Sequence, residues 1–518
     1  MENLMYLKSG TDIRGTALSK DGGNIDLTDS RIESIIFSFV HFLKQKLKKD
    51  GLSISVGYDS RLTSKHISEV VEKTLLSLGV STYDCGLSST PSMFMSIINF
   101  GLDAAVEITA SHLPYEMNGL KFFTKDGGFS GGDIKEILSF AEKNPYSSGE
   151  ALCELKTLDN MGAYSAGLRK MICRGLCADE KDKPLSGLKI AVDAGNGVGA
   201  FYAKDVLGVL GANIDGSCFL EPDGHFPNHI PNPENKVAMD FISRAVTNSG
   251  SDIGIIFDTD CDRAACVDKT GEEINRNKLV ALASYLALNG RLNTGAVIVT
   301  DSVTSDGLSE FLTKDLGAVH RRFKRGYKNV IDEAKRLTSE GKNVPLAIET
   351  SGHAAFSENY YLDDGAYLVT KIIIEAARLK KTGETIDSVI KTLKLPKEEK
   401  ELRFKILLDD FRTFGENVIN GLGALAEKTD YITVAPDNFE GVRINFDKTH
   451  GDGWLLLRMS VHEPLLVLNS ESASLGGVEK MLGFFKDFIS AYKNIDISAL
   501  CSCLLPQKTN NFEKNKKF

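Results

Sequence analysis

Residues 252–263, DIGIIFDTDCDR, form an apolar run that ends in a carboxylate and continues into an aspartate-rich loop. The same design recurs in GLKIAVD, which ends at Asp193, in GAVIVTD, which ends at Asp301, and in VPLAIE, which ends at Glu349. Each run has the length of a buried strand, and we expect a helical stretch after each one. Ligands of open α/β sheets bind beyond the carboxyl ends of the strands, so these loops are expected to carry the chemistry.

The remaining patterns extend this α/β design in both directions along the chain. Residues 31–49 and 64–78 carry apolar residues at helical spacing, and AAVEIT (104–109) is an apolar run that leads into the loop at Ser111. After about residue 400 the texture changes to short alternating runs, such as GVRINF (441–446). That change predicts a small C-terminal α+β domain with a largely antiparallel sheet.

Composition limits the classes of protein that fit. The 518 residues carry a net charge of −9, with a pI near 5.6, and at roughly 100–200 residues per domain they suggest about three to five domains. Nothing in that charge favours nucleic acid, whose binding proteins usually carry a basic patch. The sequence contains no run of eighteen apolar residues, so no membrane-spanning helix is predicted. The N-terminus lacks the apolar core of a signal peptide. Nine scattered cysteines are consistent with free thiols in a cytoplasmic protein.

The strongest local signal is the aspartate loop itself, with Asp258, Asp260 and Asp262 on alternate residues. Two such charges ~6 Å apart repel by roughly 3 kcal/mol at an effective dielectric of ~20. A hard divalent ion with oxygen ligands, most naturally Mg²⁺, would relieve that repulsion. An EF-hand fits poorly, because Arg263 and Lys269 stand where such a loop wants Gly and Glu. A solvated acidic turn is the alternative.

Other polar loops are weaker signals, and each could be an ordinary surface turn. One loop holds Ser111 and His112, with Lys121 ten residues beyond Ser111. A strand-end serine is a plausible acceptor for a phosphoryl group, although a turn or capping serine is more common. A carboxylate, a hydroxyl and an imidazole occur together in Glu349, Ser351 and His353, with Asp363 following. An Arg-x-Ser segment holds Arg458 and Ser460, with His462 close by. Two further loops are cationic, one with Arg14 and one with Lys328.

Taken together and in this order, the segments resemble the α-D-phosphohexomutase superfamily, closest to bacterial phosphomannomutase/phosphoglucomutase. The resemblance rests on GTDIRG (10–15), TASHLP (109–114) with NGLK (118–121), PDGHFPNHIPNPE (222–234), DTDCDR (258–263), ETSGH (349–353) and RMSVHEPLLVLNSE (458–471).

The resemblance implies an α/β fold class: three related α/β (mixed sheet) domains plus a smaller C-terminal α+β domain around one central cleft. The expected boundaries are 1–157, with the phosphoserine loop; 158–272, with the metal loop; 273–394, with the sugar-recognition loop; 395–505, with the phosphate clamp; and a disordered tail at 506–518.

It also implies roles for single residues. Ser111 would carry the transferred phosphate, and a phosphoserine oxygen would join Asp258, Asp260 and Asp262 as a ligand of Mg²⁺. The catalytic residues around the phosphate would be Arg14, His112, Lys121, Arg263 and His353, with Lys121 as general acid/base and His353 as its alternative. The substrate-binding residues would be Glu349, Ser351, His353 and Lys328 for the sugar phosphate and Arg458, Ser460 and His462 for the distal phosphate.

Four residues in three motifs depart from the usual family pattern. Leu113 stands where the phosphoserine loop often has Asn, and Ile348 stands where the sugar loop often has Gly. In the clamp, Val461 and His462 replace the usual Asn-Thr pair. These changes leave the catalytic positions intact and put the contacts of the clamp in question.

The implied function is reversible transfer of phosphate between C1 and C6 of a hexose phosphate, with glucose 1,6-bisphosphate as activator. Within the superfamily, phosphoglucosamine mutase is the alternative. A haloacid-dehalogenase-type phosphatase with Asp258 as nucleophile, and a non-catalytic paralogue that binds hexose bisphosphate, are the readings of other classes. Partners are expected to be small-molecule hexose phosphates, with no nucleic acid and no membrane, in a monomer or homodimer.

Overall fold

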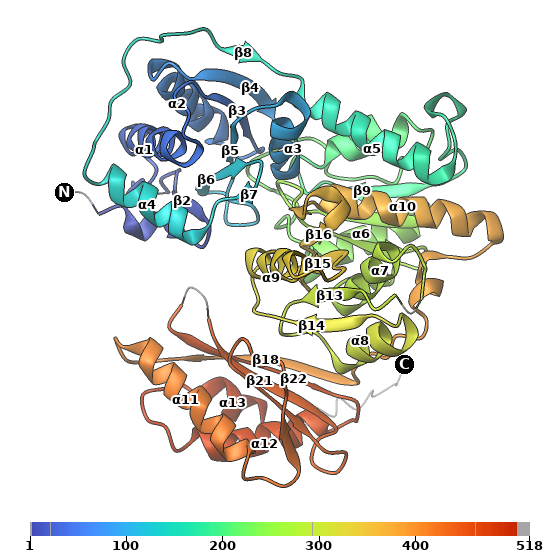
Figure 1. Ribbon diagram of the computed structural model, residues 1–518. Helices are drawn as coiled ribbons and strands as arrows, with labels where there is room; N and C mark the ends of the chain where they lie inside the picture. Colours follow the sequence, from blue (N-terminus) through green and yellow to red (C-terminus); the bar gives the residue numbers. More distant parts are fainter. Residues whose placement is uncertain (1–2, 21, 293, 461–462, 505–518) are drawn as a thin grey trace, which may run out of the picture. The chain divides into compact units, whose positions relative to one another are not determined.

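The computed structural model describes residues 3–20, 22–292, 294–460 and 463–504. The chain forms two compact units (Figure 1). Of the described residues, those within 3–301, 310–321 and 326–393 form the first unit, and those within 302–309, 322–325 and 394–504 form the second. Among the helices in the described ranges, none combines the length and the apolar character that crossing a membrane requires.

The first sheet belongs to the N-terminal domain and is mixed. Its strand order is β1-β2-β6-β5-β3-β4-β8, with β7 paired to β6. The strands are β1 (Lys8–Ser9), β2 (Asp12–Thr16), β3 (Ser53–Tyr58), β4 (Ser81–Leu87), β5 (Ala104–Ile108), β6 (Met117–Thr124), β7 (Gly127–Gly128) and β8 (Lys156–Thr157). The helices are α1 (Asp29–Leu47), α2 (Ser64–Ser77), α3 (Thr90–Phe100) and α4 (Gly131–Ala141).

Side chains alternate across the first sheet and build two cores. Val106 and Phe122 belong to the larger core, with helices α1, α2 and α4, where the rings of Phe39 and Phe122 stack at 4.3 Å. Ala105 and Phe123 belong to a smaller core with α3. Because the period of a strand is two residues, both faces of β5 and β6 are covered. Packing on both faces therefore fixes the two strands, and the turn that joins them carries Ser111.

Two further sheets lie in the first unit. The second has the order β12-β11-β10-β9, and the third the order β14-β13-β15-β16-β17. The strands are β9 (Ile190–Asp193), β10 (Ile253–Phe257), β11 (Ala264–Asp268), β12 (Glu273–Ile274), β13 (Val297–Thr300), β14 (Val319–Arg322), β15 (Leu346–Ile348), β16 (Ala354–Phe356) and β17 (Leu362–Asp363). The helices are α5 (Asn160–Leu176), a π-helix (Tyr202–Gly208), α6 (Lys236–Ser249), α7 (Asn277–Ala287), a second π-helix (Phe311–Asp315), α9 (Tyr327–Ser339) and α10 (Gly365–Thr382). Helix α8 (Asp306–Glu310) lies in the same stretch of sequence but belongs almost entirely to the second unit.

The expectation of a helix after every apolar run is wrong for two of them. Strand β10 turns at 258–263 and returns as antiparallel β11, and β15 returns as antiparallel β16. The returning segments AACVD (264–268) and AAF (354–356) are short and fully buried, which suits a strand better than a helix. As a result, the aspartate loop 258–263 and the loop 349–353 are hairpin turns, and a backbone bridge joins Arg263 to His353.

The second unit is built on one antiparallel sheet, as the alternating runs predicted. Its order is β18-β22-β21-β20-β19. The elements are β18 (Glu398–Lys405), α11 (Phe411–Ala426), β19 (Ile432–Val434), β20 (Val442–Phe446), β21 (Gly453–Met459), β22 (Leu465–Ser472), α12 (Gly477–Ile489) and α13 (Ser498–Cys503). Phe404, Leu455, Leu457 and Phe485 are buried between sheet and helices. The fold class is thus confirmed as three α/β/α domains and a fourth domain with its own sheet. The domain boundaries remain a prediction, and the expected tail at 506–518 lies outside the described residues.

Candidate active site

Ser111 lies in the turn between β5 and β6, in the left-handed backbone region with φ 51°. Its Oγ lies 3.0 Å from Oδ2 of Asp258 and accepts a hydrogen bond from Nη2 of Arg263 at 3.1 Å. Its backbone N–H donates to Oγ1 of Thr109 at 2.8 Å. The serine of the first domain therefore lies directly against the aspartate loop of the second.

Asp59 and Arg61, which the sequence analysis did not single out, hold this turn in place. Arg61 donates to the carbonyl oxygens of Ser111, Leu113, Pro114 and Met117. Asp59 accepts from Oγ1 of Thr109 at 2.7 Å and lies 3.2 Å from Nε of Arg61, with both side chains fully buried. A signal was present, because Asp59 closes strand β3 just as other carboxylates close β9 and β10.

Asp258, Asp260 and Asp262 come together as a buried cluster with ligand oxygens within 4.8 Å of one another. Oδ1 of Asp260 and Oδ1 of Asp262 are buried and accept no hydrogen bond from any described residue. Burial and then the charge of Asp262 raise the pKa of Asp258 well above its usual range. Two orphaned carboxylate oxygens beside a carboxyl that resists ionisation indicate a shortage of positive charge, so the cluster fits a hard divalent cation such as Mg²⁺.

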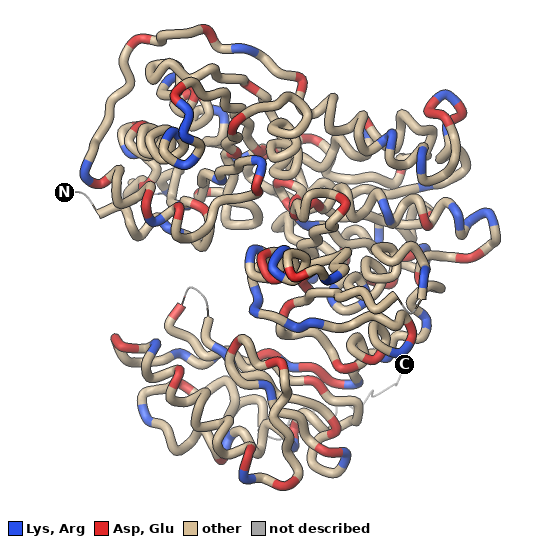
Figure 2. The backbone as a smooth tube through the Cα atoms, viewed as in Figure 1, with Lys and Arg blue, Asp and Glu red and all other residues tan. Residues whose placement is uncertain are grey.

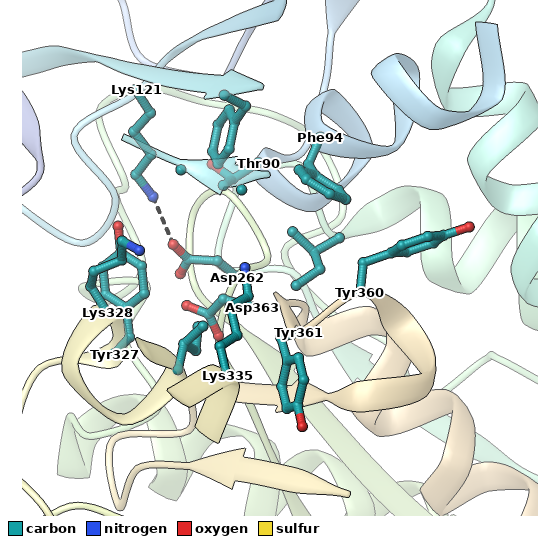
Figure 3. Close-up of a pocket in the computed structure, with 15 residues that line it drawn as sticks. Thr90, Phe94, Lys121, Asp262, Tyr327, Lys328, Lys335, Tyr360, Tyr361 and Asp363 are labelled. Atoms are coloured by element: carbon teal, nitrogen blue, oxygen red, sulfur yellow. Dashed lines mark hydrogen bonds and ion pairs between the residues drawn. The ribbon is translucent and has the colours of Figure 1, made fainter. Parts of the chain in front are cut away.

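Lys121 occupies one side of this cluster. Its Nζ donates to Oδ2 of Asp260 at 2.8 Å and to Oδ2 of Asp262 at 2.7 Å, and Figure 3 shows it pointing at Asp262. Burial alone would lower the pKa of Lys121, but the charges of Asp260 and Asp262 outweigh it and raise that pKa well above the usual range. Thr90, also missed from the sequence, donates to Oδ2 of Asp260 at 2.5 Å. Lys121 is therefore held as a cation next to the aspartates.

Two arginines and a neutral histidine complete the surroundings of Ser111. Arg263 is buried and donates from Nε to Oδ2 of Asp258 at 3.0 Å. Arg14 donates to Oδ2 of Asp12 at 2.7 Å and to the carbonyl oxygen of Ala110 at 3.4 Å. Burial and the charges of Arg263 and Arg14 lower the pKa of His112 to about 2. Basic and acidic residues are interspersed elsewhere along both units (Figure 2). The grouping of Arg14 and Arg263 around Ser111 is therefore a local feature of the site.

The loop 349–353 of the third domain, which was expected to recognise the sugar, lies next to the aspartate cluster. Nδ1 of His353 bonds to Asp363 and lies 3.9 Å from Oδ1 of Asp262. Burial lowers the pKa of His353, but the charges of Asp363 and Asp262 outweigh that effect and raise it to about 9. Glu349 accepts from the backbone N–H of Gly326 at 2.5 Å, and Oγ of Ser351 lies 3.5 Å from its other oxygen.

A pocket beside this loop links the third domain to Lys121. Tyr327 and Lys328 line it together with Lys121, Asp262 and Asp363 (Figure 3). The ring of Tyr327 stacks on His353 with centroids 5.1 Å apart, and Nζ of Lys328 donates to Asp332 at 2.5 Å. Lys328 therefore lies at the site, whereas Tyr327 was not recognised as part of it from the sequence.

The residues expected to bind the distal phosphate belong to the second unit. Arg458 is buried, with Nη1 3.6 Å from Oε1 of Glu440. The other oxygen of Glu440 accepts from Oγ of Ser302 at 2.6 Å and from the backbone N–H of Arg325 at 3.0 Å. Oγ of Ser460 accepts from the backbone N–H of Glu463 at 3.3 Å. His462 lies outside the described residues.

A serine of one α/β/α domain lies against an aspartate turn of the next that could hold a metal ion, and phosphoryl transfer depends on such positioning and charge neutralisation. Family models described as phosphoglucomutase/phosphomannomutase α/β/α domains I, II and III match residues 7–147, 164–271 and 275–394. The chain therefore belongs to the phosphoglucomutase/phosphomannomutase family of the α-D-phosphohexomutase superfamily, whose members are intramolecular phosphotransferases.

Individual relatives agree with this assignment. A phosphoglucomutase/phosphomannomutase from Thermococcus kodakarensis is 30% identical over 87% of this chain and 92% of its own length. A phosphoglucomutase from Neisseria gonorrhoeae is 28% identical over 86% of this chain and 90% of its own. The crystal structure of a phosphoglucomutase/phosphomannomutase family protein from Burkholderia thailandensis superposes with a TM-score of 0.76, at 24% identity, over 95% of this chain and 98% of that one.

Proposed function

We propose that the chain moves a phosphate between C1 and C6 of glucose and mannose phosphates, with Ser111 as the phosphorylated relay. The observation that carries this proposal is the contact of Ser111 Oγ with both Asp258 and Arg263. A phosphate on that oxygen would meet a metal cluster on one side and cationic side chains on the other. Positioning and charge neutralisation of this kind are the main sources of catalysis in phosphoryl transfer.

The metal cluster defines the proposed cofactor. Asp258, Asp260 and Asp262, together with an oxygen of phosphoserine 111, would hold Mg²⁺. Bound there, the ion would neutralise charge on the phosphoryl oxygens. Arg263 already bridges Asp258 and Ser111, and Arg14 lies on the carbonyl side of the same turn, so the protein supplies the remaining positive charge itself.

Two transfers are required. In the first, the free hydroxyl of a hexose monophosphate attacks the phosphorus of phosphoserine 111, the bond to Oγ breaks, and a 1,6-bisphosphate forms. The bisphosphate turns round, and Oγ of Ser111 attacks its other phosphate in the second transfer. In each step a proton leaves the attacking hydroxyl and one returns to the leaving oxygen. Lys121, held as a cation beside Asp260 and Asp262, is the proposed general acid/base, and His353 is the alternative.

The sugar and its distal phosphate need their own contacts. Glu349 and Ser351 would bind ring hydroxyls, with His353 and Lys328 beside them, and Arg458, Ser460 and His462 would bind the non-reacting phosphate. A bisphosphate that escapes leaves Ser111 unphosphorylated. Added glucose 1,6-bisphosphate would restore the phosphate and so act as an activator.

The first experiment is a coupled mutase assay with Mg²⁺ and catalytic glucose 1,6-bisphosphate on the 1-phosphates of glucose, mannose and glucosamine. We expect turnover of glucose and mannose 1-phosphate at comparable rates. Activity on the glucosamine substrate alone would instead assign a phosphoglucosamine mutase. No turnover of any of them, with the phosphoenzyme present, would leave the non-catalytic binding protein.

The relay itself is tested by Ser111→Ala, with the exposed Ser339→Ala as matched control. We expect the first variant to lose at least about 10³-fold in kcat while keeping its melting temperature, and the control to remain active. The phosphate on the wild-type enzyme should resist hydroxylamine. A hydroxylamine-labile phosphate would instead indicate an aspartyl phosphate on Asp258, and normal activity of Ser111→Ala would refute the relay.

A further inference from the structure

The segment 222–234, PDGHFPNHIPNPE, has no role in the site described so far. It nevertheless contacts residues 60–62, which include the arginine that holds the Ser111 turn. Gly224 packs against the backbone of the first domain, since a Cβ there would lie 2.4 Å from the N atom of Leu62 and 2.6 Å from the carbonyl oxygen of Ser60. The ring of Phe226 faces the guanidinium of Arg61 at 5.4 Å. Arg61 in turn donates to the carbonyl oxygen of Ser111.

The far end of the same segment contacts the second arginine of the site. Oδ1 of Asn232 accepts from Nη1 of Arg263 at 3.3 Å, and Oε2 of Glu234 lies 4.0 Å from the same nitrogen. Nδ2 of Asn275 fixes this end by donating to the carbonyl oxygen of Pro233 at 2.7 Å. One loop therefore contacts both arginines that bond to Ser111, one from each of two domains.

A buried ion pair holds the middle of the loop. Nε2 of His229 lies 3.0 and 3.2 Å from the two carboxylate oxygens of Asp193, which ends strand β9, and both side chains are fully buried. Nδ1 of His229 lies 2.9 Å from the carbonyl oxygen of Ile230. Because both ring nitrogens face acceptors, both must donate, and the imidazole is a cation.

The groups around His229 support this charge state. The charged group that faces it is Asp193, whose carboxylate also meets the thiol of Cys218. Its other neighbours are the rings of Phe219 and Phe241 and the backbone of Gly195. Burial lowers the pKa of His229, but the bond and the charge of Asp193 outweigh it and raise the pKa above the ordinary value.

We propose that 222–234 is a positioning loop for phosphoryl transfer, fixed by the His229–Asp193 pair, which sets Arg61 and Arg263 around Ser111. The inference rests on the proposed mutase function. His229 is a positioning residue, because it acts only through the loop. Misplacing a catalytic group by about 1 Å can cost about 10²-fold in rate, so the effect belongs in kcat.

The sign of the pH effect follows from the pair. A histidine whose cation is stabilised in the fold makes its full contribution below the unfolded pKa of about 6.5 and loses it as the pH rises through the higher folded value. The wild-type enzyme should therefore lose kcat on the alkaline side as the imidazolium is deprotonated.

The test compares kcat, KM and their pH profiles for wild type, His229→Gln and His229→Leu. Gln keeps one N–H donor but no charge, so we expect kcat to fall about tenfold, without the part of the alkaline limb that His229 causes and with KM little changed; Leu should cost about 10²-fold. His66→Gln is the matched control, since His66 pairs with Asp29 at 2.9 Å on the surface, and it should behave as wild type.

The possible results distinguish a failure of the proposed mutase function from a failure of the positioning role alone. If the wild type turns over no hexose phosphate, the proposed function fails and this inference fails with it. If the wild type is active and His229→Gln keeps its kcat and its alkaline limb, the positioning role alone is refuted. Should the His229 variants not fold, Asn232→Ala, at a half-buried position, carries the test: about a tenfold loss of kcat at constant KM supports the role, and an unchanged kcat overturns it.

Discussion

Ser111 adopts a backbone conformation that side chains other than glycine seldom occupy, at a cost of about 1–2 kcal/mol. The conformation persists because the turn is held from several sides, by the hydrogen bonds of Arg61 to four carbonyl oxygens and by Thr109 at the backbone N–H. The direction of the Oγ is therefore set by the fold before any substrate binds. Such preorganisation is what a transferred group needs when little covalent chemistry is available to the protein.

A single carboxyl away from the site gives a pH-dependent stability. Glu72 in α2 is buried with only Oγ of Ser68 as a described donor, at 3.1 Å. Burial and then the charge of Asp84 raise its pKa to about 7. Because the folded protein disfavours the charged form, the stabilising effect of protonation is lost as the pH rises from about 4.5 to 7. Glu72→Gln should therefore raise the free energy of unfolding by about 1–2 kcal/mol at pH 8 and by little at pH 5.

Urea denaturation at both pH values measures this effect. Glu136→Gln, at an exposed carboxylate in helix α4 that does not contribute to the pKa shift of Glu72, is the matched control and should change stability equally at the two pH values. An equal effect of Glu72→Gln at pH 5 and pH 8 would contradict the assignment.

At this scale the sequence revealed the residues that sit in compact motifs, such as Ser111 with His112 and the three aspartates. It did not reveal Arg61, Thr90 or Tyr327. Their partners lie far away in the chain: Thr90 bonds to Asp260, and Tyr327 shares a 2.8 Å hydrogen bond with Thr11. No local pattern encodes such contacts, because those of Arg61 form only when the first domain folds and those of Thr90 and Tyr327 only when the domains pack together.

Among the elements, helix α10 has an unusual start. It begins at Gly365, whose backbone N–H donates to the carbonyl oxygen of Cys261 at 3.1 Å in the metal loop. A Cβ on Gly365 would lie 2.8 Å from the carbonyl carbon of Arg263 and 2.9 Å from the carbonyl oxygen of Cys261. Helix α10 can therefore approach the metal loop only without a side chain at this position.

Gly365→Ala should push the metal loop away from the helix. We expect at least a tenfold rise in the Mg²⁺ concentration that gives half-maximal activity, with a loss of about 1–3 kcal/mol in stability from overpacking. Gly167→Ala in helix α5 is the control, because nothing lies within 4 Å of the added Cβ, and it should leave the magnesium response unchanged. The same magnesium response in both variants would show that the loop tolerates the displacement.

The helices and strands themselves were largely predictable, since segments 31–49 and 64–78 became α1 and α2 and the alternating C-terminal runs became an antiparallel sheet. The two hairpins were not. In the sequence alone, where burial is not visible, a short apolar run such as 354–356 can be a strand or the start of a helix, and pairing with β15 makes it a strand. The contact between Arg263 and His353 depends on those hairpins, so it could not be predicted from the sequence either.

On the scale of the whole molecule, the second compact unit includes two loops that precede its own sheet by many residues. Arg443 on β20 is buried, lies 3.7 Å over the ring of Trp454, and donates to the carbonyl oxygens of Ser302 and Thr304 at 3.2 and 3.0 Å. Its Nη2 donates to Asp306 at 2.7 Å. The loops 302–309 and 322–325 therefore belong structurally to the C-terminal sheet. The sequence predicted four domains but not this exchange of loops.

A fragment of residues 394–504 should consequently be less stable than the same region in the intact protein. Removing the partners of a buried charge costs about 3–5 kcal/mol, and Arg443 would lose three of its acceptors. Hydrogen exchange of β20 and β21 in the fragment and in the full chain compares the two states. Equal protection of these strands in the fragment and in the full chain would show that the loops contribute nothing. In addition, Arg443→Met should stabilise the fragment and destabilise the full chain.

The backbone bridge between Arg263 and His353 also bears on how such proteins can diversify. Three α/β/α domains of similar design look like modules that recombination could exchange between relatives one at a time. Here the hairpin turns of the second and third domains touch through main-chain atoms, and Thr90 of the first reaches Asp260 of the second. A chimaera with one foreign domain would inherit mismatched halves of a single centre, so these domains should descend together as one hereditary block.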